Sequence, residues 1–199
     1  MLSRFFDQCF DEGHFRDFEP GELERTLKLV DWFEIEQGWR IIEPGCGCGR
    51  MTRLLAEKVG PGGWIEACEL SPRMVEYCHH AGFPPWVRFC NESVLSLNLP
   101  PGETDAIVCF NVWPHFSGKD TYLDCFKEYL KPGGFLYIAH SCGREFINAI
   151  HKSASEDRIR QHVLPPVDEL SRQLKKACWI ALEKCEEEDI YYLKATKAG

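Results

Sequence analysis

Residues 41–50 read IIEPGCGCGR, in which a short apolar run leads into three glycines at alternate positions. Glycine has no Cβ, so Gly45, Gly47 and Gly49 allow a tight turn and let a bound molecule approach the backbone closely. A strand that leads through such a turn into a helix is the first unit of a doubly wound α/β fold. This segment constrains the fold more than any other part of the sequence.

Short apolar runs rich in Ile, Val and Phe alternate with amphipathic stretches, which favours a parallel sheet covered by helices on both faces. The expected strands are Trp39–Glu43, Gly63–Glu69, Trp86–Cys90, Asp105–Phe110 and Phe135–His140, followed by a hairpin of Trp179–Lys184 and Ile190–Ala195. The expected helices are Gly21–Phe33, Gly49–Val59, Pro72–Ala81, Lys119–Leu130, Arg144–Lys152 and Pro166–Ala177. The prediction is a Rossmann-like, doubly wound α/β fold with a mostly parallel seven-stranded sheet and a C-terminal antiparallel hairpin.

Composition and charge exclude several classes of protein. The chain has 199 residues, the size of one domain, and its net charge of −8 disfavours nucleic acid as a partner. Apolar runs fall far short of the roughly 18 residues that cross a bilayer, and the first residues lack the apolar core of a signal peptide. We therefore expect no membrane partner and a cytoplasmic location. The 11 irregularly spaced cysteines form no C-x-x-C pair, which predicts reduced thiols in place of disulfides or zinc ligands.

The acids near the glycine loop indicate the class of ligand. Glu69 ends the second expected strand, 24 residues after Gly45, where doubly wound folds bind the ribose hydroxyls of an adenosine. Gly49 falls one residue earlier than the third glycine of the G-x-G-x-x-G loop that binds a dinucleotide pyrophosphate. Glu43 beside the loop would repel a pyrophosphate and favour a cation. S-adenosylmethionine, with its sulfonium and ammonium groups, therefore fits better than a nicotinamide cofactor, and an NAD-dependent dehydrogenase is the weakest alternative.

Five ordered motifs identify a family. They are Glu43–Gly49, Cys68–Met74, Asn91–Ser93, Asp105–Asn111 and Leu130–Gly134. Through them, residues 41–135 resemble a class I S-adenosylmethionine-dependent methyltransferase of the small-molecule type, similar to the methyltransferases of ubiquinone and menaquinone biosynthesis. The sequence departs from the family at Cys48, where Thr is frequent, and at positions 43, 69 and 92, where Glu replaces the common Asp. Glutamate is one methylene longer and keeps the same hydrogen-bonding chemistry.

The resemblance implies which residues hold S-adenosylmethionine. Glu69 is expected to bind the ribose hydroxyls and Glu92 the adenine amino group. The backbone of residues 45–47 and that near Phe110 are expected to hold the methionine part. The full set of expected cofactor-binding residues is Glu43, Gly45, Cys46, Gly47, Glu69, Leu70, Glu92, Ser93 and Phe110.

Polar residues follow the fourth and fifth expected strands, at the edge where open α/β sheets bind ligands. His115 and His140 are the candidate catalytic bases because imidazole titrates near neutrality, although an acceptor that is already nucleophilic needs alignment and no base. Trp113, Arg144 and His151 are the candidate substrate-binding residues, and Arg144 suits an anionic group. The spacing of His115, His140 and His151 matches no metal-binding motif, so no metal site is expected.

The aromatic segment of residues 4–18 leads to a prediction about the N-terminal region. Residues 1–36 are expected to form a helical cover, and residues 37–199 the cofactor-binding core of a single domain. The indicated function is in-line transfer of the S-adenosylmethionine methyl group to a small-molecule acceptor, by a monomer or homodimer. Two alternatives stay open: a thiol- or metalloid-directed methyltransferase that uses Cys109 or Cys142, and a non-catalytic S-adenosylmethionine-binding regulator.

Overall fold

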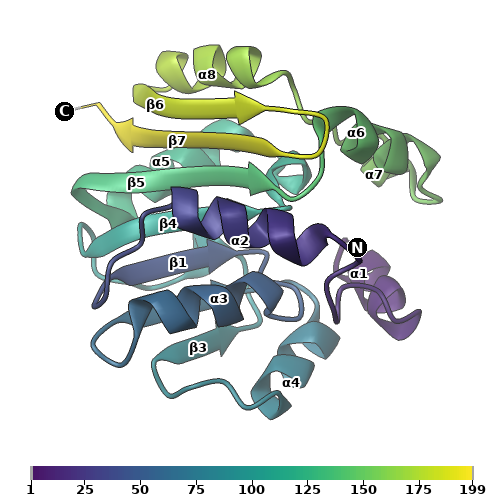
Figure 1. Ribbon diagram of the computed structural model, residues 1–199, viewed down its shortest axis with the longest axis horizontal. Coiled ribbons are helices and arrows are strands. Elements are labelled where there is room, and N and C mark those ends of the chain that lie inside the picture. The colour runs from purple at the N-terminus through teal and green to yellow at the C-terminus, as the bar shows by residue number, and fades with distance from the viewer. Residues whose placement is uncertain (1, 199) are drawn as a thin grey trace.

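Seven strands form one sheet in the order β3-β2-β1-β4-β5-β7-β6 (Figure 1). The computed structural model describes residues 2–198, and in it every neighbouring pair from β3 to β5 is parallel, whereas β7 is antiparallel to β5 and β6. The strands are β1 (Arg40–Pro44), β2 (Trp64–Cys68), β3 (Val87–Cys90), β4 (Thr104–Phe110), β5 (Leu130–His140), β6 (Trp179–Glu186) and β7 (Tyr191–Lys197). The predicted doubly wound fold with its closing antiparallel hairpin is confirmed.

The helices cover both faces of this sheet, and Figure 1 shows α2 and α3 in front of it and α5 behind it. The α-helices of the described residues are α1 (Leu2–Asp11), α2 (Glu22–Trp32), α3 (Arg50–Val59), α4 (Pro72–His80), α5 (Lys119–Tyr129), α6 (Arg144–Ser153), α7 (Asp157–Arg160) and α8 (Val167–Lys176). Two short 3-10 turns are η1 (Val94–Ser96) and η2 (Trp113–His115). None of the helices within residues 2–198 has the length and apolarity needed to span a membrane.

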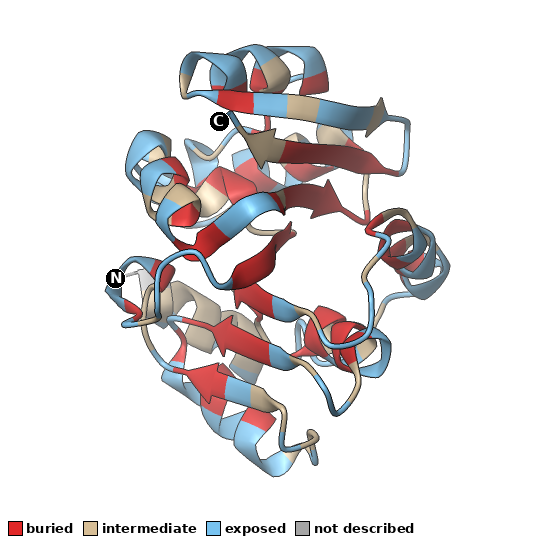
Figure 2. Cartoon of the chain, turned by 90° about the vertical axis from the view of Figure 1, so that its left-hand side faces the viewer, coloured by how far each residue is buried: buried red, intermediate tan, exposed pale blue. Residues whose placement is uncertain are grey.

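The central strands are buried on both faces because the helices cover both (Figure 2). Successive side chains of a strand point to opposite faces, so Ile41 and Ile42 of β1 enter different hydrophobic clusters. Ile41 belongs to the cluster that contains Leu55 of α3, and Ile42 belongs to the cluster that contains Phe126 of α5. This two-sided core fixes the positions of the strand ends.

The fold differs from the sequence prediction at the start of β5. The expected strand begins at Phe135 and the expected helix before it ends at Leu130, whereas β5 begins at Leu130 and includes Lys131–Gly134. The pairing jumps from Thr104–Leu130 to Ala106–Phe135, so the segment forms an irregular bulge against β4. The one-turn helix α7 was not expected either, because four residues are too few to show a helical period.

The carboxyl end of β5 points toward α1, α6 and α7 (Figure 1). Helix α1 is attached to α4, since Ser71 Oγ donates to Asp7 Oδ1 at 2.5 Å and Arg73 forms an ion pair with Asp11. Ser71 also caps α4 by accepting a hydrogen bond from the Met74 amide, as its position before Pro72 predicts. These contacts bring the N-terminal helix to the end of the sheet where the parallel strands terminate.

Tyr137 of β5 fastens α2 to the sheet, and this contact gives a stability prediction. Its buried hydroxyl donates to the carbonyl of Phe33 at 2.5 Å. Tyr137→Phe leaves that carbonyl without its donor and is expected to lower the free energy of unfolding by about 1–3 kcal/mol. Urea denaturation measures the change, with Tyr77→Phe on the exposed side of α4 as the matched control. Equal stability of the two variants would contradict this assignment.

Candidate active site

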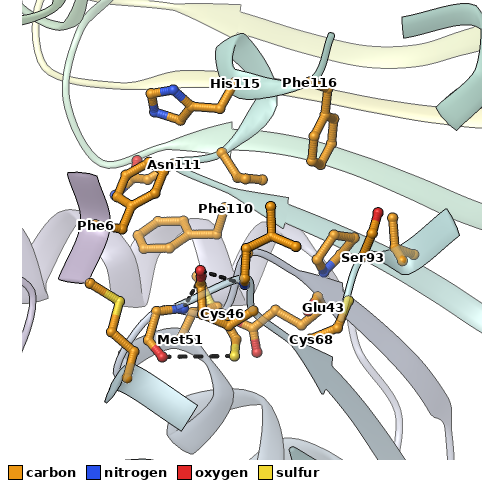
Figure 3. A pocket seen from close by; sticks show the side chains of 18 of the residues that line it. Phe6, Glu43, Cys46, Met51, Cys68, Ser93, Phe110, Asn111, His115 and Phe116 are labelled. Carbon is orange, nitrogen blue, oxygen red and sulfur yellow. Dashed lines mark hydrogen bonds between the residues drawn. The ribbon is translucent and has the colours of Figure 1, made fainter. Parts of the chain in front are cut away.

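A cavity of about 270 Å³ lies at the carboxyl ends of β1, β2 and β4. In Figure 3, Glu43, Cys46 and Cys68 lie on one side of it, and His115 and Phe116 lie on the other. All nine residues expected to bind the cofactor line this cavity: Glu43, Gly45, Cys46, Gly47, Glu69, Leu70, Glu92, Ser93 and Phe110. These nine residues therefore lie around one cavity, and the role of each in binding is a proposal.

The glycine loop between β1 and α3 is fixed by its neighbours. Gly45 has φ 70°, and a Cβ at this position would lie 2.4 Å from Cγ2 of Val112, so only glycine fits. The Gly45 amide donates to the carbonyl of Cys68 at 2.7 Å, which ties the loop to the end of β2. The loop backbone is thereby held against the cavity without side chains in the way.

The Glu69 carboxylate joins the glycine loop to the start of α4. Its Oε2 accepts from the amide of Gly47 at 3.1 Å, and its Oε1 accepts from the amides of Leu70 and Ser71 at 2.7 and 3.0 Å. Burial raises the pKa of Glu69, and these three donors oppose the rise by stabilising the charged form. A carboxylate fixed in this way in the cavity wall can accept hydrogen bonds from a ribose diol.

Glu43 is a buried acid whose charge has no partner among the described residues. It is 2% exposed, and its Oε2 makes no hydrogen bond within residues 2–198. Burial, with a smaller contribution from the nearby Glu69 carboxylate, raises the pKa of Glu43 to about 8 against the opposing effect of Thr52. An uncompensated acid in the wall of a cavity suits a cationic ligand, because a positive charge would stabilise the ionised form.

The third acid lies on the loop after β3. Glu92 is half-buried in the cavity wall, and the next residue, Ser93, accepts from the amide of Leu95 at 3.2 Å to begin η1. Glu69 is connected to this loop, since the Asn91 side chain donates to the Glu69 carbonyl at 3.0 Å. The acids at positions 69 and 92 therefore line neighbouring parts of one wall.

Aromatic side chains line the opposite part of the cavity. Phe6 of α1 meets the His115 ring edge to face at 5.4 Å, and Phe116 stacks on Tyr122 at 4.2 Å. Burial lowers the pKa of His115 to about 3, with a further contribution from His151. The imidazole of His115 is therefore neutral near pH 7 and able to accept a proton.

Five residues were expected to act on the acceptor, and four of them are absent from the cavity wall that the described residues form. Trp113 is 1% exposed within the hydrophobic core, and Arg144 pairs with Glu186 and Glu145. His140 is buried beside Tyr191, and His151 donates from Nδ1 to the carbonyl of His162 at 2.7 Å. This corrects the expectation that polar side chains after β4 and β5 all face one site: of the five, only His115 reaches the cavity.

A buried polar network beside the cavity was not predicted. Glu22 of α2 accepts from Arg50 at 2.7 Å and from the Ser141 hydroxyl at 2.9 Å, and Asn111, in the left-handed region at φ 53°, exchanges hydrogen bonds with Ser141. Glu22 resembles the exposed acids around it in the sequence, so no local pattern reveals its burial. The network fastens α2 to the glycine-loop helix α3 and to the segment after β5.

Within residues 2–198, no group of three or more His, Cys, Asp and Glu side chains is arranged to hold a metal ion.

Comparison with known proteins identifies the family. Residues 41–134 match a family model described as a methyltransferase domain. The crystal structure of a SAM-dependent methyltransferase from Aquifex aeolicus superimposes with a TM-score of 0.71 and 19% identity over 89% of this chain and 93% of that one. Residues 41–134 of the chain therefore form a methyltransferase domain. The acidic cavity described above fits S-adenosylmethionine, the cofactor on which the Aquifex aeolicus protein depends.

Relatives of this methyltransferase domain act on different acceptors. The chain is 25% identical over 150 residues to 2-methyl-6-phytyl-1,4-hydroquinone methyltransferase of Synechocystis, over 70% of this chain and 46% of that protein. It is 26% identical over 139 residues to phosphoethanolamine N-methyltransferase 3 of Arabidopsis thaliana, over 69% of this chain and 27% of that protein. The chain thus spans less than half of the length of each of these relatives.

The geometry of Glu69 gives a binding prediction. Glu69→Ala removes a charged acceptor from the cavity and is expected to weaken S-adenosylhomocysteine binding by about 10- to 100-fold, the value of a hydrogen bond to a charged group. Titration calorimetry measures the affinity, with Glu76→Ala on the exposed side of α4 as the control. Thermal melts of both variants show whether each protein is folded at the temperature of the titration, so that weaker binding is not confused with unfolding. Unchanged affinity in a folded Glu69→Ala protein would overturn the ribose assignment.

The raised pKa of Glu43 gives a prediction about proton release. With a pKa of about 8, Glu43 holds its proton at pH 7 in the free protein. A cationic ligand beside it lowers that pKa, so binding of S-adenosylmethionine at pH 7 is expected to release a proton. Calorimetry in two buffers of different ionisation enthalpy counts released protons. Glu43→Gln should abolish the release and Glu57→Gln, on the exposed side of α3, should not; equal release by all three proteins would contradict the assignment.

Proposed function

We propose that the chain transfers the methyl group of S-adenosylmethionine to an uncharged, ring-bearing small molecule by in-line displacement. The observation that supports this is a single cavity with three acids and a glycine loop on one side and aromatic rings with a neutral histidine on the other. Bound S-adenosylmethionine supplies an activated methyl group on a positively charged sulfur. The residues of the chain supply binding, alignment and a proton acceptor.

The residues that would hold the cofactor divide by its chemical parts. We assign the ribose hydroxyls to Glu69 and the adenine amino group to Glu92. The methionine part, which carries the positive charges, is assigned to Glu43 and the backbone of residues 45–47, with Phe110 covering it. Cys46 contributes packing, because burial raises the pKa of its thiol and keeps it uncharged.

The charge of the cavity supports an uncharged acceptor. Arg50 is the one Lys or Arg among the described lining residues, and it is engaged by Glu22 at 2.7 Å. Arg144, expected to bind an anionic group, pairs with Glu186 instead. Phe6, Phe116 and their aromatic neighbours favour contact with a ring. Of the two relatives above, the hydroquinone methyltransferase is therefore the better guide to the acceptor than the phosphoethanolamine enzyme.

Helix α1 and the segment after it form the cover of the acceptor side in this proposal. Phe6 and Phe15 contribute to the cavity wall. Two polar contacts hold α1, one from the buried Ser71 hydroxyl to Asp7 and one between exposed Arg73 and Asp11, and both must break for α1 to open. A cover of this kind excludes water during transfer and admits the acceptor when it opens. Residues 1–36 would thus include a movable part, α1, and a fixed part, α2.

Free thiols bear on the location and on one alternative function. All 11 cysteines are free, which supports a reducing compartment such as the cytoplasm. Cys109 is fully buried, and burial raises the pKa of its thiol; Cys142 is half-buried away from the cavity wall described. Neither position supports a thiolate that acts at the acceptor, so the thiol-directed alternative is disfavoured. A monomer or a homodimer is compatible with this proposal.

Transfer of a radiolabelled methyl group to a panel of acceptors tests the proposed function. We expect label on methylhydroquinone and little on phosphoethanolamine, arsenite or free cysteine. Label on phosphoethanolamine alone would contradict the proposed acceptor class. Tight binding of S-adenosylhomocysteine without transfer to any acceptor would favour a non-catalytic regulator. Absence of binding would contradict both.

A further inference from the structure

Three histidines from separate elements meet behind the acceptor side of the cavity. His115 ends η2, His151 lies on α6, and His162 lies between α7 and α8. The ring centroid of His115 is 4.9 Å from that of His151 and 5.0 Å from that of His162. Of the three, only His115 is among the described residues of the cavity wall, so the other two form a layer behind it.

The closest contact in this cluster joins two ring nitrogens. Nδ1 of His115 lies 2.8 Å from Nδ1 of His162, so one of these nitrogens carries a hydrogen and the other accepts it. His151 fixes the position of His162, because its Nδ1 donates to the His162 carbonyl at 2.7 Å. Within residues 2–198, Nε2 of His115 and Nε2 of His162 make no hydrogen bond. One hydrogen-bonded pair thus has an outer nitrogen at each end.

The surroundings keep the pair uncharged. The titratable neighbours that lower the pKa of His115 are His151, His162, His140 and Lys119. Burial, followed by these neighbours, lowers the pKa of His115 to about 3, and burial also lowers the pKa of His162. A charged imidazolium is therefore disfavoured at His115, so a proton that arrives at one ring nitrogen has to be matched by a proton that leaves from the other.

We propose that His115 and His162 form a proton relay that carries the acceptor's proton out of the cavity during methyl transfer. This inference rests on the proposed function. As the acceptor's lone pair forms the new bond to the methyl carbon, the bond between that carbon and the sulfur breaks. The electron pair of that bond stays on the sulfur, which leaves S-adenosylhomocysteine, and the acceptor's hydrogen moves to Nε2 of His115. The Nδ1 hydrogen of His115 moves to Nδ1 of His162, and Nε2 of His162 releases its hydrogen to water. Each ring ends with one hydrogen, and one proton reaches solvent.

The position of His162 supports the outward direction. It lies between Gln161 and Val163, which are both exposed, whereas Phe6 covers the His115 ring on the side of the cavity cover. His115 is the catalytic residue in this account because it contacts the acceptor. His162 is a positioning residue that acts through His115, and His151 orients His162 through its carbonyl.

Nitrogen NMR of the full chain with labelled histidine tests the relay without any acceptor. At pH 7 we expect His115 to carry its hydrogen on Nδ1 and His162 to carry its hydrogen on Nε2. On acidification, one added proton should shift the signals of both rings at the same pH, below pH 6, and place a hydrogen on Nε2 of His115. A hydrogen on Nε2 of His115 already at pH 7, or separate titration of the two rings, would overturn the proposal.

His162→Asn provides a second test, because the amide can accept the hydrogen bond from His115 and cannot pass a proton on. In this variant we expect His115 to titrate alone, S-adenosylhomocysteine affinity to stay within twofold, and methyl transfer to methylhydroquinone to fall at least tenfold. His79 is exposed, so His79→Asn is the matched control. It should change neither the titration of His115, nor the S-adenosylhomocysteine affinity, nor the rate of methyl transfer. Unchanged transfer in His162→Asn would overturn the relay, whereas loss of S-adenosylhomocysteine binding by the unaltered chain would instead contradict the proposed function.

Discussion

The buried carboxylate of Glu69 is the interaction on which the site depends. A charge at this depth is costly unless backbone donors surround it, and the amides of Gly47, Leu70 and Ser71 provide three. These donors come from the loop after β1 and from the start of α4, so one side chain sets the spacing of both segments. Glycines make a loop flexible in isolation, but this loop forms a fixed part of the cavity wall. The Gly45 amide also donates to the carbonyl of Cys68 at the end of β2.

A second buried charge extends this arrangement to the rest of the molecule. The ion pair of Glu22 and Arg50 joins α2 to the first turn of α3, and the Ser141 hydroxyl connects it to the segment after β5. Removal of one partner from a buried pair costs about 3–5 kcal/mol, because the other charge is left without compensation. Helix α2 is therefore part of the framework of the cavity, whereas α1 is attached to α4 through Asp7 and Asp11.

The cofactor side could be predicted from the sequence to a large extent, and the acceptor side could not. Glu43, Glu69 and Phe110 stand at or next to the carboxyl ends of strands, and parallel strands bring these ends to one edge whatever the rest of the chain does. After β4, a 3-10 turn buries Trp113 in the core and places His115, two residues later, at the cavity. The spacing of these residues in the sequence does not reveal which of them faces the cavity. His162 lies outside any periodic segment, and its contact with His115 across 47 positions has no local signal.

The central claim is that one cavity holds the adenosine of the cofactor against its acidic wall and leaves the transferable methyl group on the side of His115. A crystal structure of the chain with S-adenosylhomocysteine bound tests this most directly. The account predicts that the ribose hydroxyls contact the Glu69 carboxylate, the adenine amino group contacts Glu92, and the sulfur faces the aromatic side of the cavity. A ligand bound elsewhere, or one whose ribose does not contact Glu69, would contradict it.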